Sequence, residues 1–301
     1  MKKIIIFFVA LFACCGVQRN IFLKTEDKTV GWNARYNLFY DKKRFPDGVI
    51  DAQGKMLIPF DLHACLCAWD LHGVVLKHNT WPWVLYAKSK AVMLRKGLWQ
   101  YAKLFKRYGD TTKELKTKQR AQGFPESGID GLYHFFIEDQ FQDDTKLLAS
   151  TLARLRHVRG YLDEEVLSIV SGLEKRGVHT HVLSNMNRSE AKKLSTLFSA
   201  KKSSVKDRKH HVYLADLLVR EGNFLVSTDD FLLAKPLPDV YHLFLKKHPR
   251  QYGLRLFVDD KPENLKAAVQ HGFDVGILMK TPSKLIQSFQ GLGLIGGSRS
   301  A

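Results

Sequence analysis

The chain has 301 residues, of which 45% are hydrophobic and 26% are charged, an ordinary composition for a folded protein with a sizeable core. These values exclude a disordered chain, and the four cysteines are too few for a disulfide scaffold of this size. Lysine and arginine number 47 against 30 aspartates and glutamates, which gives a formal net charge of +17. This excess favours contact with phosphate, nucleic acid or anionic lipid, but it identifies no chemistry.

The N-terminal segment 1–17 has the anatomy of a secretory signal. Lys2 and Lys3 precede an uncharged apolar run that ends at Val17. As a helix this run would reach about 21 Å, less than the roughly 30 Å hydrocarbon core of a bilayer, so a full membrane span is disfavoured. A sequence similar to a bacterial lipoprotein cleavage box ends at Cys14. We expect an exported or membrane-associated protein; the alternatives are an uncleaved anchor, or a buried first strand in a cytoplasmic protein.

Residues 18–61 form a polar, turn-rich extension in which we expect one hairpin, and they suggest no function. The first strong strand follows at 64–69 and is apolar on both faces, which is typical of a strand inside a sheet that is covered on both sides. Cys65 and Cys67 share one face of this strand, and we interpret them as packing residues.

Helical patterns dominate residues 79–164. After them the sequence alternates between strand and helix, which indicates a parallel sheet with helices on both faces. The expected strands lie at 178–183, 254–258 and 275–279, and the expected helices at 189–198, 238–247, 262–271 and 282–290. The sequence therefore predicts an α/β protein with a Rossmann-like parallel sheet core at 62–78 and 165–291. An all-helical domain at 79–164 is inserted into this core, and a flexible tail follows at 292–301.

Polar side chains follow the expected strands where the strands end. The carboxyl ends of parallel strands meet at one edge of a sheet, where ligands bind. A carboxylate there can attack phosphorus, paired carboxylates can hold magnesium, and a lysine and a hydroxyl can stabilise the charge on a transferring phosphoryl group. The residues that supply these groups are Asp70, Ser184, Asn185, Lys235, Asp259 and Asp260.

These segments resemble, in the usual order, the four motifs of the haloacid dehalogenase-like (HAD) hydrolase superfamily. The matching segments are Asp70-x-His72-Gly73-Val74, Leu183-Ser184-Asn185, Lys235-Pro236-x-Pro238-Asp239 and Val258-Asp259-Asp260-Lys261-Pro262-Glu263-Asn264. The resemblance covers about residues 62 to 280. It implies a HAD-like core, and the inserted helices resemble the helical cap that many members place between the first two motifs. Such caps close over the site and determine substrate specificity.

The resemblance implies a role for each matching residue. Asp70 would be the nucleophile and a magnesium ligand, and Lys235 would orient it and offset negative charge. Asp260 would bind Mg²⁺ directly, Asp259 would bind it directly or through water, and Asn264 would support this loop. The expected enzyme is therefore a magnesium-dependent hydrolase.

Phosphate would be held by Ser184, by the backbone of Asn185 and by Gly73. The sequence departs from the family pattern at His72, where the family's phosphatases have a second aspartate that acts as general acid and base. An imidazole can also transfer protons, and the main-chain carbonyl of His72 can still bind magnesium. We expect a phosphatase that acts on a small phosphorylated metabolite through an aspartyl-phosphate. The alternatives are a phosphomutase or another HAD-type C–X cleavage, and an inactive protein that binds phosphate or polyanion through its basic surface.

A basic run at 201–211 lies between the second and third motifs. We interpret it as a solvated loop, with a patch for a polyanionic substrate or nucleic acid as the alternative. The sequence carries no recognised nucleic-acid-binding motif, so nucleic acid is not the expected partner. The sequence leaves the oligomeric state open, and any membrane association would come from the N-terminal segment.

Overall fold

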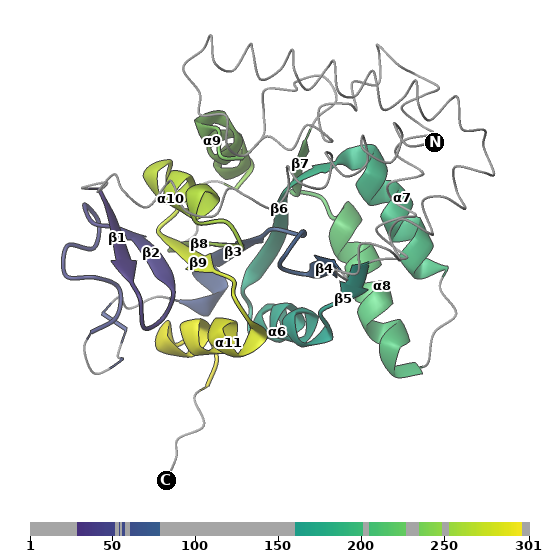
Figure 1. The fold of residues 1–301 in the computed structure, drawn as a ribbon, viewed down its shortest axis with the longest axis horizontal. Coiled ribbons are helices and arrows are strands. Elements are labelled where there is room, and N and C mark those ends of the chain that lie inside the picture. Colours follow the sequence, from purple (N-terminus) through teal and green to yellow (C-terminus); the bar gives the residue numbers. More distant parts are fainter. Residues whose placement is uncertain are drawn as a thin grey trace, which may run out of the picture.

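The computed structural model describes residues 29–51, 54, 56–57, 61–78, 160–200, 205–226, 235–248 and 253–296. In this part of the chain, helices flank a seven-stranded mixed sheet with the order β1-β2-β9-β8-β3-β6-β7 (Figure 1). The five strands from β9 to β7 are mutually parallel, as predicted for the core. The strands of this sheet are β1 (Val30–Asn33), β2 (Leu38–Asp41), β3 (Cys65–Trp69), β6 (His179–Asn187), β7 (Phe224–Val226), β8 (Leu254–Asp259) and β9 (Val275–Leu278).

The parallel strands follow the order of a doubly wound α/β sheet. The chain adds β6 and then β7 on one side of β3, crosses back, and adds β8 and then β9 on the other side. The direction of winding therefore reverses between β3 and β8. Ligands of such sheets bind in the crevice outside the carboxyl ends of the strands at this switch point.

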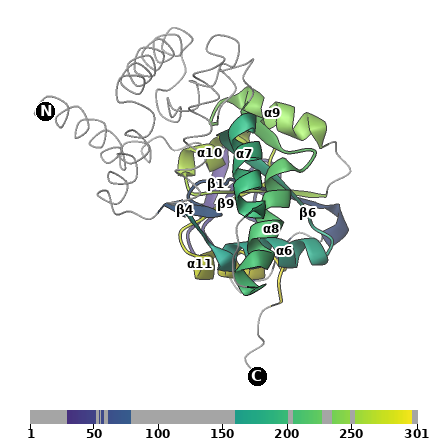
Figure 2. The ribbon, with the colours of Figure 1, turned by 90° about the vertical axis from the view of Figure 1, so that its right-hand side faces the viewer.

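Helices cover both faces of the sheet. Buried residues of α6, α7, α8 and α11 belong to one hydrophobic cluster, and those of α9 and α10 belong to a second. Figure 2 shows α7 and α8 side by side, where they pack against each other. The helices are α6 (Glu164–Lys175), α7 (Arg188–Ser199), α8 (Val205–Val219), α9 (Pro238–Lys247), α10 (Pro262–Gln270) and α11 (Pro282–Gly291), and a short 3-10 turn, Leu62–Ala64, precedes β3.

Strand β3 lies at the centre of this core because its side chains are apolar on both faces. Cys65, Cys67 and Trp69 pack into the first hydrophobic cluster, whereas Leu66 and Ala68 pack into the second. All five residues are fully buried, which confirms the predicted strand. Burial raises the pKa of the Cys65 thiol to about 12, so this cysteine is a packing residue and not a reactive thiolate.

Three helices begin with proline, which suits the first helical position because its missing N–H needs no partner there. They are α9, α10 and α11, and their observed bounds match the predicted ones to within one residue. Helix α6 begins instead at an aspartate cap, where Asp163 Oδ1 accepts the Val166 N–H at 3.1 Å. The local sequence signals are therefore sufficient for these four helices.

The N-terminal extension contains the predicted hairpin, formed by β1 and β2. Strand β2 pairs antiparallel with β9, so the hairpin extends the parallel sheet by two strands. Arg44 forms an ion pair with the buried Asp274 and donates to the Gly253 carbonyl at 3.1 Å. The described part of the extension is therefore integral to the core.

Two predictions were wrong, one for the end of β6 and one for the basic segment that follows later in the chain. The strand predicted at 178–183 continues to Asn187, because β7, which the sequence analysis missed, pairs with its second half across a bulge. The basic run predicted to be a solvated loop is helical from Val205 onward, as the start of α8. Leu214 and Leu218 of α8 are fully buried, and this packing stabilises a helix whose own apolar pattern is weak.

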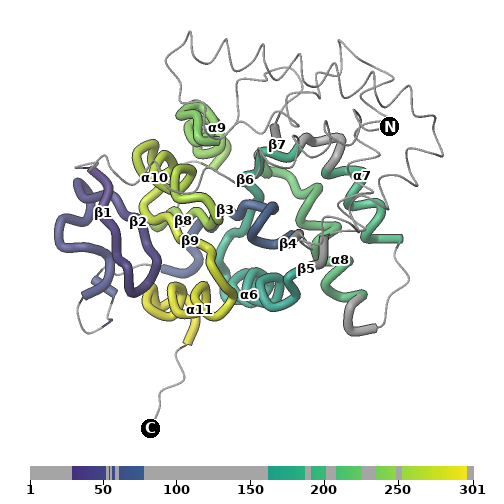
Figure 3. The backbone as a smooth tube through the Cα atoms, in the orientation of Figure 1, coloured from purple at the N-terminus to yellow at the C-terminus, as the bar shows by residue number. Residues whose placement is uncertain are grey.

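A two-stranded ribbon follows the first predicted motif. Strands β4 (Leu76–His78) and β5 (Gly160–Leu162) are antiparallel, and His78 lies opposite Gly160. Figure 3 shows the chain passing through β4 and returning through β5 beside it. The chain therefore leaves and re-enters the core at one place, as an insertion requires.

Several predictions lie outside the described residues. They are the signal-like segment 1–17, most of the helical insertion at 79–164, and residues 297–301 of the predicted flexible tail. At the start of that predicted tail, Leu292 and Leu294 are instead fully buried in the first hydrophobic cluster. Among the described residues, no helix is both long and apolar enough to cross a membrane. The predicted domain boundaries stay predictions.

Candidate active site

Four charged side chains meet at the switch point of the sheet. Asp70 directly follows β3, Asp259 ends β8 and Asp260 comes next. Carboxylate oxygens of these three residues lie within 4.8 Å of one another. Lys235, which precedes α9, places Nζ 2.7 Å from Asp259 Oδ2 and 3.0 Å from Asp70 Oδ1. The fold thus brings together residues that are up to 190 positions apart in the sequence.

The sheet register explains this meeting. Trp69 of β3 lies opposite Val258 of β8, and the Asp70 N–H donates to the Val258 carbonyl at 2.9 Å. The next residue on each strand, Asp70 and Asp259, therefore emerges at the same edge. Because these strands are parallel neighbours at the switch point, both carboxylates reach the Lys235 ammonium at this edge of the sheet.

Lys235 is buried together with the carboxylates that it contacts. Its exposed fraction is 1%, and that of Asp259 is 0%. Burial by itself would lower the pKa of Lys235, but the charges of Asp259 and Asp70 outweigh it and raise the pKa above its ordinary value. The ammonium group therefore stays charged and serves as the counter-ion inside the site.

One ammonium does not balance three carboxylates. Asp260 is exposed as a residue, but partial desolvation of its carboxyl group, followed by the charges of Asp259 and Asp70, raises its pKa to about 7. The pKa of Asp259 is also raised, because burial and the charge of Asp70 outweigh the attraction of Lys235. The site therefore carries an excess of negative charge that a bound cation would relieve.

The donor set fits a hard divalent cation. Mg²⁺ prefers oxygen ligands, commonly one or two carboxylates. Among the described residues, Asp70, Asp259 and Asp260 are the one group of His, Cys, Asp and Glu side chains close enough together to share a metal ion. The His72 imidazole is not part of this group, and the contribution of its main-chain carbonyl stays a prediction.

Both carboxylate oxygens of Asp259 accept hydrogen bonds. Asn264 Nδ2 donates to both carboxylate oxygens at 3.0 and 3.1 Å, and the Lys261 N–H donates to Oδ1 at 2.8 Å. The buried Tyr241 hydroxyl donates to the Asn264 carbonyl at 2.9 Å. Asn264 therefore contacts Asp259 directly, and its supporting role in the site stays a prediction. The sequence analysis missed Tyr241, since a tyrosine at helical spacing on α9 gives no signal beyond core packing.

Gly73 allows the first motif to approach Asp260 closely. Gly73 has a φ of +79°, which few other residues adopt, and a Cβ at this position would collide with the Asp260 carboxylate. The Gly73 N–H donates to the Leu76 carbonyl at 3.0 Å, and His72 forms a backbone bridge to Leu76. Gly73 thus brings the loop that carries His72 against Asp260.

Ser184 lies in the carboxyl-terminal half of β6, two residues beyond the point where Val182 pairs with Trp69. The residue is 1% exposed, and its Oγ has no hydrogen-bond partner among the described residues. A buried hydroxyl without a partner loses free energy unless a ligand or water satisfies it. The next residue, Asn185, directs its side-chain amide at the main chain of Lys235. The contact of its own backbone with phosphate stays a prediction.

Comparisons with known proteins give weak matches. No protein-family model matches the sequence, and no curated protein is significantly similar to it. Among solved structures, a HAD family enzyme from Bacteroides thetaiotaomicron matches with 15% identity over 72% of this chain and 93% of that one, at a TM-score of 0.37. An aspartate-to-alanine variant of it, in complex with magnesium and inorganic phosphate, matches with 14% identity over 72% and 94% of the two chains, at a TM-score of 0.38.

A structure described as a dehalogenase matches with 16% identity over 69% of this chain and 82% of that one, at a TM-score of 0.35. At TM-scores and identities this low, the similarities establish neither the family nor the activity of this chain. The assignment of function therefore depends on the residues of the site itself.

Proposed function

We propose that this chain is a HAD-like hydrolase, namely a magnesium-dependent phosphatase that acts on a small phosphorylated metabolite. The observation that carries the proposal is the buried Lys235 ammonium between Asp70 and Asp259, with Asp260 completing a group of three carboxylates. These residues belong to three of the four segments that resemble HAD motifs. Their meeting at the switch point of the sheet is what the resemblance requires.

Asp70 is the nucleophile in this proposal. It directly follows the central strand, and its side chain is 8% exposed. One carboxylate oxygen forms a bond to phosphorus while the bond from phosphorus to the alcohol oxygen of the substrate breaks, which gives an aspartyl-phosphate and an alcohol. Water then attacks phosphorus, the bond to Asp70 breaks, and inorganic phosphate leaves.

Protons must move in both steps. The departing alcohol oxygen takes up one proton, and the attacking water gives one up. His72 lies two residues after Asp70, in the loop that bridges to Leu76, and an imidazole can donate in the first step and accept in the second. His72 is therefore the proposed general acid and base, in the position where the family's phosphatases have aspartate.

Magnesium, when bound, would neutralise charge on the phosphoryl oxygens and orient the substrate. Asp70 and Asp260 are the proposed direct ligands. Asp259 already accepts hydrogen bonds from Lys235, Lys261 and Asn264, so it is better suited to contact through water. Lys235 holds Asp70 in place and offsets the charge that accumulates in the crevice.

Ser184, on the neighbouring strand β6, is the proposed phosphate ligand. Its buried Oγ lacks a partner among the described residues, and a phosphoryl oxygen would supply one. The insertion that leaves at His78 and returns at Gly160 is the proposed cap. A cap that closes over the site would restrict the size of the substrate and exclude water from the first step.

The test is turnover of a panel of small phosphate monoesters by wild type, Asp70→Asn and His72→Ala, each with magnesium and with chelator. Asp47→Asn, at an exposed position outside the site, is the matched control. We expect phosphate release that needs magnesium, is lost in Asp70→Asn and is retained in Asp47→Asn. Release that persists in Asp70→Asn, or no release from any monoester, would refute the proposal.

A further inference from the structure

Asn185 holds both polar atoms of the Lys235 main chain. Its Oδ1 accepts the Lys235 N–H at 2.8 Å, and its Nδ2 donates to the Lys235 carbonyl at 3.0 Å. The two residues lie 50 positions apart, on β6 and in the segment before α9. One side chain thus joins the second motif to the backbone that carries the ammonium of the site.

Lysine reaches its targets through a flexible four-carbon stem. The tip of Lys235 is held by ion pairs with Asp70 and Asp259, at 3.0 and 2.7 Å. Its root, which is the main chain of Lys235, is held by the two hydrogen bonds with the Asn185 side chain. Because the side chain is almost fully buried, a shift of the root must displace the ammonium group or distort its contacts. Displacements of about 1 Å can cost catalysis on the order of 100-fold.

We propose that Asn185 is a positioning residue, whose side chain fixes the Lys235 backbone so that Nζ lies between Asp70 and Asp259. This inference rests on the proposed function. It gives the side chain a role distinct from the phosphate contact predicted for the backbone of the same residue. Replacement by alanine keeps the backbone N–H, so the variant Asn185→Ala tests the side chain alone.

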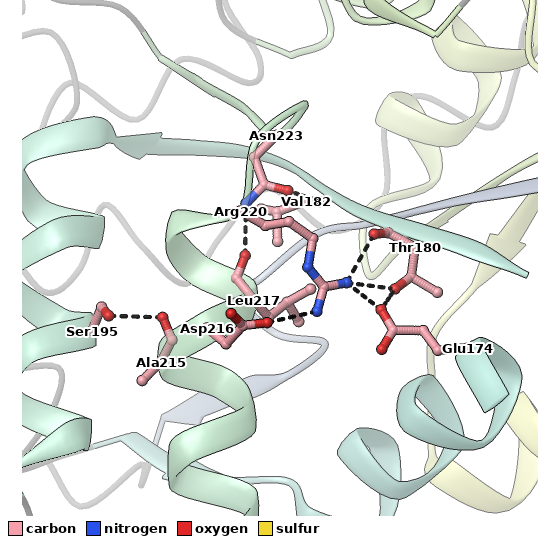
Figure 4. A network of polar contacts seen from close by, with 9 residues as sticks. All are labelled: Glu174, Thr180, Val182, Ser195, Ala215, Asp216, Leu217, Arg220 and Asn223. Atoms are coloured by element: carbon pink, nitrogen blue, oxygen red, sulfur yellow. Dashed lines mark hydrogen bonds and ion pairs between the residues drawn. The ribbon is translucent and has the colours of Figure 1, made fainter.

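The chain offers a matched control at Asn223. Its Oδ1 accepts the Val182 N–H at 2.8 Å, and its Nδ2 donates to the Leu217 carbonyl at 2.6 Å (Figure 4). Asn223→Ala therefore also removes two hydrogen bonds between a side-chain amide and the main chain, and one of them involves the same strand β6. It differs from Asn185→Ala in having no contact with Lys235.

The experiment compares wild type, Asn185→Ala, Asn223→Ala, Lys235→Met and the double variant Asn185→Ala/Lys235→Met in the full chain with magnesium. We expect both asparagine variants to lower the melting temperature. Asn185→Ala alone should lower kcat, by about 10–100-fold, with KM changed less than about threefold. In the Lys235→Met background, removal of the Asn185 side chain should have almost no further effect, because the two residues act as one unit.

A second measurement does not depend on turnover. Labelling of Lys235 by acetic anhydride, followed by peptide mass spectrometry, should be slow in wild type and Asn223→Ala and at least about tenfold faster in Asn185→Ala. Equal labelling in all three proteins would overturn the positioning role even if the protein had no phosphatase activity. A rise in KM with unchanged kcat would overturn it in favour of a direct substrate contact. Fast labelling in Asn185→Ala alone, together with an inactive wild type, would support the positioning role and reject the proposed phosphatase.

Discussion

Replacing Lys235 by methionine removes the counter-ion of the site while keeping a buried chain of similar length. At an effective dielectric constant of about 20, unit charges 2.7 and 3.0 Å apart attract by about 6 and about 5.5 kcal/mol. The cost of burying the ammonium offsets part of this attraction. Removing one partner of a buried ion pair typically costs about 3–5 kcal/mol, and we expect the free energy of unfolding to fall by this amount at about pH 8 without magnesium.

The loss of unfolding free energy in Lys235→Met should depend on pH. Without Lys235, the folded-state pKa values of Asp259 and Asp260, which are already raised, rise further above their unfolded values, because the charge of Lys235 lowers both. Carboxylates with a raised pKa destabilise the fold once they ionise, and this penalty disappears as the pH falls through the folded-state pKa. We therefore expect the loss in Lys235→Met to be smaller at about pH 5 than at about pH 8, by more than about 1 kcal/mol.

The assay is equilibrium unfolding in urea with chelator at both pH values, with Lys246→Met as the control. Lys246 lies on α9, in the same region of the fold, and is exposed. Saturating magnesium should restore more stability to Lys235→Met than to wild type, because the cation replaces the missing positive charge. A loss below about 1 kcal/mol at pH 8, or an equal loss at both pH values, would refute the reasoning.

Three further substitutions test the same site. The pKa of Asp260 is raised to about 7, so its ionised carboxylate weakens the fold increasingly as the pH rises from about 4 to about 7. In chelator, Asp260→Asn should therefore be more stable than wild type at about pH 8 and equally stable near pH 4. The gain should be only roughly 1 kcal/mol, because solvent screens the charge of this exposed residue. Urea unfolding at several pH values measures the difference, and a loss of stability at about pH 8 would contradict the prediction. Gly73→Ala places a Cβ against the Asp260 carboxylate at a φ of +79°. It should therefore lower the free energy of unfolding by about 1–3 kcal/mol and weaken magnesium binding measured by calorimetry. An unchanged magnesium affinity would show that this contact does not shape the metal site. Tyr241→Phe removes the hydrogen bond to the Asn264 carbonyl and should cost about 1 kcal/mol in thermal unfolding; no change in stability would mean that the bond contributes nothing.

Local sequence signals were sufficient for much of the core. Strand β3 follows from an apolar run on both faces, and α9, α10 and α11 follow from proline at the first helical position. The positions of Asp70 and Asp259 at strand ends could be predicted because a strand end is a local property. Their meeting at one edge follows from the rule that parallel strands share their carboxyl edge.

The tertiary structure decided the features that depend on a distant partner. Strand β6 continues to Asn187 because β7 pairs with it, and the hairpin joins the sheet because β9 offers a free edge. A strand edge accepts any strand with matching backbone groups, so side-chain patterns do not reveal which one will pair.

The same distinction applies within the site. The sequence determined which residue types stand at the ends of the strands, and therefore the chemistry that they can supply. It could not show that the Asn185 side chain holds Lys235, or that Tyr241 supports Asn264, since these contacts join segments that only folding brings together. A polar side chain finds its hydrogen-bond partner by proximity in space, and that proximity is set by the packing of the helices on the sheet.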